Sequence, residues 1–193
     1  DIDVIDSQYK VNIAATNGGG ALPATAGQIT VNAGSMTVER KNTSPSGNVT
    51  NSASDMLLAS YTFTAFGEPI KVETLQVALD TSGTDADYTL RNGRLMINGS
   101  QVGSTVGLIA AGLATNARTF TTNFVVTPGS PATVEVRGDI FDEEDTGAEF
   151  VAADTLQIAL LDTNASNASR QVSLGTLDVP TGSNVNGNVL TIT

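Results

Sequence analysis

The sequence contains no cysteine, histidine or tryptophan. Without cysteine and histidine the chain has no disulfide, no thiol nucleophile, no imidazole base and none of the common zinc or iron sites. Only 9 Lys and Arg stand against 20 Asp and Glu, a formal net charge of −11, so we expect neither a nucleic-acid partner nor an anionic membrane surface. No apolar run reaches the roughly 20 residues that a membrane span needs. These absences predict a protein that is not an enzyme and is not inserted in a membrane.

The residues that are present are typical of a β-protein. Among 193 residues, 40% are hydrophobic, and Thr (26), Gly (19), Ser (15) and Asn (15) are abundant. β-Branched residues and turn formers in this mixture favour short strands joined by tight turns. We predict an all-β fold, an Ig-like or jelly-roll-like antiparallel β-sandwich of about ten strands, with an N-terminal extension strand.

Alternation of apolar and polar residues places the strands of the predicted sandwich. They are expected at 28–40, 57–65, 70–79, 88–97, 118–126, 132–140, 150–161, 171–179 and 188–192. The segment 106–114 is rich in Ala and Leu but is interrupted by Gly107 and Gly112, so we predict a loop or a single turn there.

One short sequence occurs twice, as TLQVALDT at 74–81 and TLQIALLDT at 155–163. A β-bulge would accommodate the extra leucine of the second copy. Because the flanking residues do not align at the same offset, we predict one sandwich rather than two duplicated halves.

The N-terminal segment 5–15 alternates cleanly and predicts one amphipathic strand. Its apolar face consists of Ile5, Tyr9, Val11 and Ile13. Asn17 and then Gly18, Gly19 and Gly20 follow, a run that predicts a flexible hinge. We therefore divide the chain into a donor strand and hinge at 1–20 and a β-sandwich domain at 21–193.

Acidic residues crowd one predicted loop and are the candidate metal ligands. They are Asp139, Asp142, Glu143, Glu144 and Asp145. Calcium takes such oxygen ligands, but their spacing is not that of a calcium-binding loop, so a solvated acidic loop is the alternative. No other cofactor is expected.

Two further short motifs concern the surface. Asn-x-Ser/Thr sequons begin at Asn42, Asn48, Asn98, Asn164 and Asn167, and all fall in or beside predicted turns, where glycans could be attached. The tripeptide Arg137, Gly138 and Asp139 would suggest integrin binding in an animal matrix protein. Because it ends a predicted strand, we attribute it to chance.

Part of the sequence resembles a known class of domain. The segment SGNVTNSASDMLLASYTFTAFGEPIKVETLQVAL at 46–79, with LRNGRLMINGSQVGST at 90–105 and TVEVRGDI at 133–140, resembles Ig-like β-sandwich domains of prokaryotic secreted and surface-layer proteins. The resemblance implies a sandwich fold and a surface location, and little about activity.

A sandwich with a detachable N-terminal strand is also similar in architecture to the subunit of a pilin-like donor-strand filament. In such a filament the arm of one subunit fills the open sheet edge of the next, and the head-to-tail contact propagates. We therefore expect a structural subunit of an extracellular homopolymer on the cell surface, mature after removal of a signal peptide. Two alternatives remain. The arm can pair within its own subunit, or the chain can be a monomeric surface domain for adhesion or ligand binding, with calcium held by the acidic loop.

Overall fold

A computed structural model of the chain describes residues 2–5, 12–15, 33–81, 89–110, 112, 116–140 and 150–193. The chain divides into two compact units, Asp1–Val31 and Asn32–Thr193. This boundary lies eleven residues after the one that the sequence suggested at 20. The described residues contain strands, turns and bends but no helix, and thus no helix that could cross a membrane.

The first unit contains a two-stranded antiparallel sheet. Strand β1 (Ile2–Ile5) pairs with β2 (Asn12–Ala15), with Ile5 opposite Asn12 and Ile2 opposite Ala15. The prediction of one continuous strand over 5–15 is therefore wrong, because the chain must reverse its direction between Ile5 and Asn12 for these residues to pair. Alternation reports the period of a strand, but it does not show where a strand folds back on itself.

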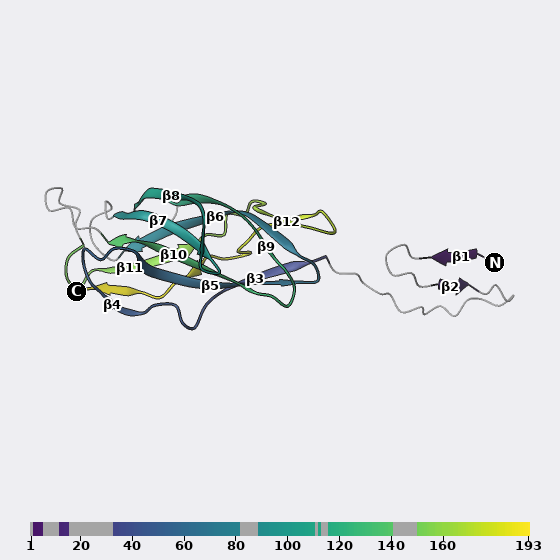
Figure 1. Ribbon diagram of the computed structural model, residues 1–193, viewed down its shortest axis with the longest axis horizontal. Coiled ribbons are helices and arrows are strands. Elements are labelled where there is room, and N and C mark those ends of the chain that lie inside the picture. Colours follow the sequence, from purple (N-terminus) through teal and green to yellow (C-terminus); the bar gives the residue numbers. More distant parts are fainter. Residues whose placement is uncertain are drawn as a thin grey trace. The chain divides into compact units, whose positions relative to one another are not determined.

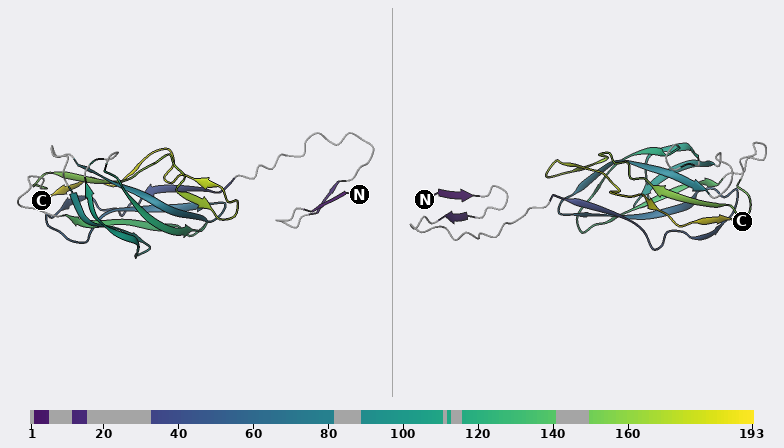
Figure 2. Two further views of the ribbon diagram at one scale, coloured as in Figure 1. Left: turned by 90° about the horizontal axis from the view of Figure 1, so that it is seen from above. Right: turned by 180° about the vertical axis from the view of Figure 1, so that it is seen from behind.

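The second unit is a sandwich of two sheets (Figures 1 and 2). The first sheet has five strands in the order β3-β5-β10-β7-β8. Their bounds are β3 (Ser35–Arg40), β5 (Met56–Phe66), β7 (Thr89–Ile97), β8 (Ser100–Ala110) and β10 (Ala132–Ile140). All its pairings are antiparallel, so the first sheet has β3 at one edge and β8 at the other.

The second sheet has eight strands, with the order β13-β12-β6-β11-β15-β4 and with β9 on β6 and β14 on β11. The longer strands are β6 (Ile70–Thr81), β9 (Arg118–Val126) and β11 (Thr155–Leu160). The shorter ones are β4 (Gly47–Val49), β12 (Ala168–Arg170), β13 (Thr176–Leu177), β14 (Val185–Asn186) and β15 (Leu190–Ile192). The β15–β4 pair is parallel, so the sheet is mixed. The predicted all-β sandwich is confirmed.

The core fills the space between the sheets. Its largest fully buried side chains include Tyr61, Phe63, Phe120 and Phe150. Phe63 also meets Phe124 edge to face, with 5.7 Å between ring centroids. The hydroxyl of Tyr61 donates to the Ile158 carbonyl at 3.0 Å, which ties β5 to β11 across the sandwich. Few aromatic residues are present, and the described ones serve mainly this packing.

Strand predictions were most accurate in the middle strands. The predicted bounds 118–126 and 132–140 coincide with β9 and β10. The loop predicted at 106–114 is wrong, because β8 runs through Ala110 and is held by its pairing with β7. The strand predicted at 171–179 is also wrong. Residues 171–175 are the turn between β12 and β13, which pair with each other.

The repeated sequence forms neighbouring strands. β6 and β11 pair antiparallel with Ala78 opposite Ala159, two residues that are equivalent in the repeat. The two copies are therefore related by a local two-fold axis through this pair. The bulge suggested for the extra leucine is absent. The ladder runs without a shift, and the Leu161 amide still donates to the Gln76 carbonyl at 3.0 Å.

Candidate functional site

The outer edge of β3 is the first feature that could take a partner. The Lys41 amide donates to the Ser60 carbonyl on β5, in the same register as the β3–β5 ladder. In an antiparallel ladder the backbone groups of successive residues point alternately toward and away from the partner strand. The N–H and C=O groups of Ser35, Thr37 and Glu39 therefore face β5, and those of Met36 and Val38 face outward. No hydrogen bond between described residues uses these outward groups.

Side chains cap the two ends of this free edge. At one end the Gly34 amide donates to Oε1 of Glu68 at 3.2 Å, and the Gly34 carbonyl accepts from Nε of Arg170 at 2.5 Å. At the other end Nη1 of Arg40 donates to the Gly187 carbonyl at 3.3 Å. The bonds at Gly34 use its backbone groups and end the unpaired stretch there, whereas the bond at Arg40 is made by its side chain and ties β3 to the segment before β15. The distance from Gly34 to Arg40 is about 20 Å along an extended strand.

A groove of about 380 Å³ lies along this edge. One wall is β3, from Met36 to Glu39, and the other is the segment before and within β14, with Pro180, Thr181, Ser183 and Val185. Met36 and Pro180 are buried, while Val38 and Val185 are half-buried and pack against the core. The groove is thus open to solvent beside an apolar interior.

Asn167 holds the second wall in place. Its Nδ2 donates to the Val179 carbonyl at 2.6 Å, and its Oδ1 accepts from the Val179 amide at 2.8 Å. This side chain is only 8% exposed. Both of its polar atoms are therefore used to fix the residue that precedes Pro180.

Glu68 joins the start of β3 to the β12–β13 turn. Besides Gly34, its carboxylate accepts from the Val172 and Ser173 amides, both at 2.8 Å, and from the Ser173 hydroxyl at 2.7 Å. The hydroxyl bond first, and then the backbone bonds, lower the pKa of Glu68 to about 2. A Cβ on Gly34 would lie 2.4 Å from Cγ of Glu68, so this close approach requires glycine.

The opposite side of the sandwich is closed. There β8, the other edge of the first sheet, lies against β9 of the second. Gly103 has a φ of 67° and approaches so closely that an added Cβ would lie 2.5 Å from the Thr121 carbonyl oxygen. A further strand has no room between these two backbones.

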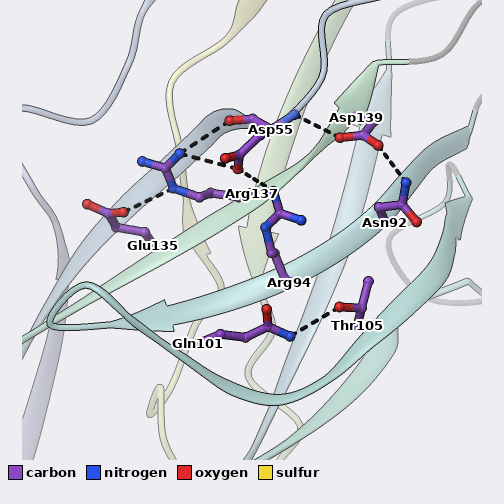
Figure 3. A network of polar contacts seen from close by, with 8 residues as sticks. All are labelled: Asp55, Asn92, Arg94, Gln101, Thr105, Glu135, Arg137 and Asp139. Atoms are coloured by element: carbon purple, nitrogen blue, oxygen red, sulfur yellow. Dashed lines mark hydrogen bonds and ion pairs between the residues drawn. The ribbon is translucent and has the colours of Figure 1, made fainter.

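A network of charged residues covers part of the outer face of the first sheet (Figure 3). Asp55 pairs with Arg94 and, at 3.4 Å, with Arg137, while Glu135 accepts from Nε of Arg137 at 3.3 Å. The Arg94 contact chiefly lowers the pKa of Asp55. These are bonds within the molecule, made by the exposed Asp55 and by three half-buried side chains, Arg94, Glu135 and Arg137.

The integrin-like tripeptide belongs to this network. Arg137 is held by Asp55 and Glu135, and Asp139 accepts from the Asp55 amide at 2.8 Å and from Nδ2 of Asn92 at 2.5 Å (Figure 3). Gly138 between them is buried within strand β10. The two side chains are already bound to other residues, and the segment is not an exposed loop.

Only one of the predicted calcium ligands, Asp139, lies among the described residues. Asp139 is held as described, and the Asp55 amide chiefly lowers its pKa. Asp142, Glu143, Glu144 and Asp145 lie outside the described residues. In the part of the chain that the structure describes, no group of three or more acidic side chains could hold a metal ion.

Two other carboxylates lie close together. Burial raises the pKa of Asp178, whose neighbour Asp162 has a pKa lowered chiefly by the Asn164 amide. The Asn184 side chain accepts from the Asp162 amide at 2.9 Å. Two carboxylates are fewer than the oxygen ligands that calcium takes, so this pair does not make a site by itself.

The sequons differ in how their asparagines are placed. Asn42, Asn48 and Asn164 are exposed, as a glycan requires. Asn98 is also exposed, but its Oδ1 accepts from the Thr133 amide at 2.9 Å. The geometry argues against a glycan on Asn167, because its Nδ2 is buried and bonded to Val179.

The predicted donor residues are only partly described. Ile5 lies on β1 and Ile13 on β2, where Ile13 is opposite Val4. Tyr9, Val11 and the hinge at Gly18, Gly19 and Gly20 lie outside the described residues.

Sequence reasoning did not find the free edge of β3 or the groove beside it. It placed a strand over 28–40, but it gave no role to Met36, Val38 or Glu68. The alternation of MTVER shows a strand; which neighbour that strand lacks depends on pairing with distant residues.

Comparisons with known proteins do not assign the chain to a group. No protein-family model matches it, and no curated protein is similar to it in sequence.

Proposed function

We propose that this chain is a structural subunit of an extracellular filament, assembled by insertion of the N-terminal arm of one subunit into an open sheet edge of the next. The observation that carries the proposal is the unpaired outer edge of β3 beside an open groove. An unpaired edge attracts another strand, because each added strand satisfies backbone groups and covers apolar surface.

The arm supplies a suitable strand. Its two strands have four residues each, in a unit separate from the sandwich. A two-stranded hairpin is at best marginally stable in water, so this unit gains stability from any third strand with which it pairs. Its apolar residues Ile5, Tyr9, Val11 and Ile13 are each worth roughly 1.5 to 3 kcal/mol when fully buried.

A head-to-tail contact of this kind does not close on itself. Each subunit uses an arm to bind one neighbour and an edge to bind another, so the contact repeats without limit. The proposed partner is therefore a second copy of the chain. Exposed sequons at Asn42, Asn48 and Asn164 agree with a surface outside the cell, where glycans can be attached.

Electron microscopy of negatively stained protein tests the proposal. We expect long, uniform fibres from the full chain and compact particles from a variant that lacks residues 1–16. A matched pair of arm variants, Ile13→Asp and Asn12→Asp, adds the same charge to adjacent residues of β2. We expect Ile13→Asp to prevent fibres and Asn12→Asp to permit them, because Ile13 is the large apolar residue of β2 and Asn12 is already polar. Monodisperse particles from the full chain at high concentration would overturn the proposal.

A further inference from the structure

We infer that the acceptor is the outer edge of β3 between Gly34 and Arg40, and that its occupant is strand β2 of a second copy of this chain. The inference rests on the proposed function and gives it a location. It follows from the backbone groups of β3, from the walls of the groove and from the charges of the two candidate strands.

The other strand edges among the described residues are less suitable for pairing with an added strand. β8 and β9 close against each other at Gly103 and Thr121. β13 and β14 have two residues each and β4 has three, so each offers a shorter ladder than β3. β3 combines outward backbone groups at Met36 and Val38 with a groove that a strand can enter.

The length of the site agrees with the length of the arm strands. Gly34 is capped by Glu68 and Arg170, so the residues whose outward groups are open to pairing are Met36, Val38 and Arg40, and the open stretch runs from Met36 to Arg40. That is five residues, one more than the length of β1 and of β2. A strand of this size would pair with the outward groups of Met36 and Val38 without displacing either cap.

Charge decides between the two arm strands. The groove has one charged lining residue, Glu39. β1 carries Asp3, whereas β2 has the sequence NIAA and no charge. Insertion of β1 would bring a second carboxylate close to Glu39, where like charges repel, but β2 brings none.

The first test uses proline to remove one outward N–H group. Val38→Pro deletes a donor that the folded subunit does not use, and proline is tolerated on an edge strand where its nitrogen faces outward. We expect the monomer to fold and the critical concentration for fibre growth to rise about tenfold or more. Thr37→Pro is the matched control. It removes an N–H that pairs with β5, so it should destabilise the subunit itself. A folded Val38→Pro variant that forms fibres like the parent would overturn the assignment.

The second test uses cysteine pairs and does not depend on the proline variant folding. The chain has no cysteine, so engineered thiols have no background. We combine Thr37→Cys with a cysteine at each of Asn12, Ile13, Ala14 and Ala15 in turn, in the full chain. Adjacent strands place opposite Cα atoms within the range of a disulfide. We expect a ladder of covalent oligomers on a non-reducing gel for one or two pairs. Thr119→Cys, an exposed position on β9, replaces Thr37→Cys as control and should give none.

Each other outcome has a definite meaning. Fibres whose covalent oligomers form with Thr119→Cys would overturn the assigned site. Fibres whose covalent oligomers form with cysteines on β1 instead of β2 would overturn the assigned strand. Both results would leave the filament proposal standing. A disulfide within one chain, seen as a faster-migrating monomer, would show that the arm fills its own subunit. That result, like the absence of fibres from the parent, would overturn the filament proposal as well.

Discussion

The two long sides of the sandwich differ, because the edge strands of the two sheets are in close contact on one side and are separated by a groove on the other. On one side β8 and β9 approach until only a glycine fits between their backbones, at Gly103 beside Thr121. On the other side a groove of about 380 Å³ lies between β3 and the segment from Pro180 to Val185. The closed side is made by backbone contact, and the segments that flank the groove on the open side are tied by side-chain bonds of Glu68, Arg170, Asn167 and Arg40.

Under the proposed function, the closed side serves the stability of the subunit and the open side serves assembly. A sandwich with both sides closed would leave no free strand edge for a partner. A sandwich with both sides open would expose long free edges, which favour nonspecific pairing with other chains. Short free edges with capped ends limit both the length and the position of an incoming strand. The following changes test whether the closed side supports the fold and the open side supports association.

The largest effect is expected on the closed side. Gly103→Ala forces a Cβ to 2.5 Å from the Thr121 carbonyl oxygen, at a φ of 67° that disfavours any side chain. Strain and overpacking together should lower the free energy of unfolding by about 2 to 5 kcal/mol. Gly99→Ala is the control, because its φ is 84° but nothing lies within 4 Å of the added Cβ. It should cost about 1 to 2 kcal/mol in urea unfolding. Equal losses for the two variants would show that this side is not closed as described.

The next effect concerns the wall of the open side. Asn167→Ala leaves the N–H and C=O groups of buried Val179 without their partner. We expect a loss of about 2 to 4 kcal/mol in the free energy of unfolding, together with weaker fibre growth. Asn42→Ala, at an exposed sequon, should change stability by no more than about 0.5 kcal/mol. If Asn167→Ala were as stable as Asn42→Ala, the wall would need another explanation.

Two strands, β10 and β8, show how far the sequence predicts the strand bounds of this fold. β10 buries every second residue from Ala132 to Ile140, so alternation alone gave its bounds. β8 has no such pattern, since most of its described side chains are exposed, and it becomes a strand because β7 pairs with it. Composition and alternation therefore suffice for the class of fold, and they fail for strands defined by their neighbours.

The candidate site was harder to predict for the same reason. Glu68 meets Gly34 and Ser173, which are 34 and 105 residues away in sequence, and nothing local marks that meeting. The outer edge of β3 is free because no other strand pairs there, and the sequence of β3 alone does not show which strands will pair with it. The hairpin of the arm was missed because Ile5 and Asn12 pair across a reversal within an alternating run.

The melting temperature measured as a function of pH should reveal the contribution of Glu68 to stability. Its pKa falls from 4.5 to about 2 on folding, so its contribution to stability is complete above about pH 4.5 and is lost as the pH falls toward 2. Glu68→Gln should therefore lower the melting temperature at pH 7 and lower it less at pH 2. Glu73→Gln is the control, an exposed carboxylate that pairs with Lys71 at 3.7 Å and accepts from the Ser169 hydroxyl at 3.2 Å. A deficit of Glu68→Gln that is the same at pH 7 and pH 2 would contradict this role.

The smallest effect is expected on the outer face of the first sheet, and it tests whether assembly uses an edge or a face. Arg137→Ala removes two partly exposed ion pairs, with Asp55 and Glu135. Pairs of this kind are each worth about 1 kcal/mol or less and are screened by salt, so the melting temperature should change little and less still at high ionic strength. Because the proposed contact uses the backbone of β3, fibre growth should be unchanged. A strong loss of fibres with a normally folded Arg137→Ala monomer would place the contact on this charged face, and the open side would then be a groove without an assembly role.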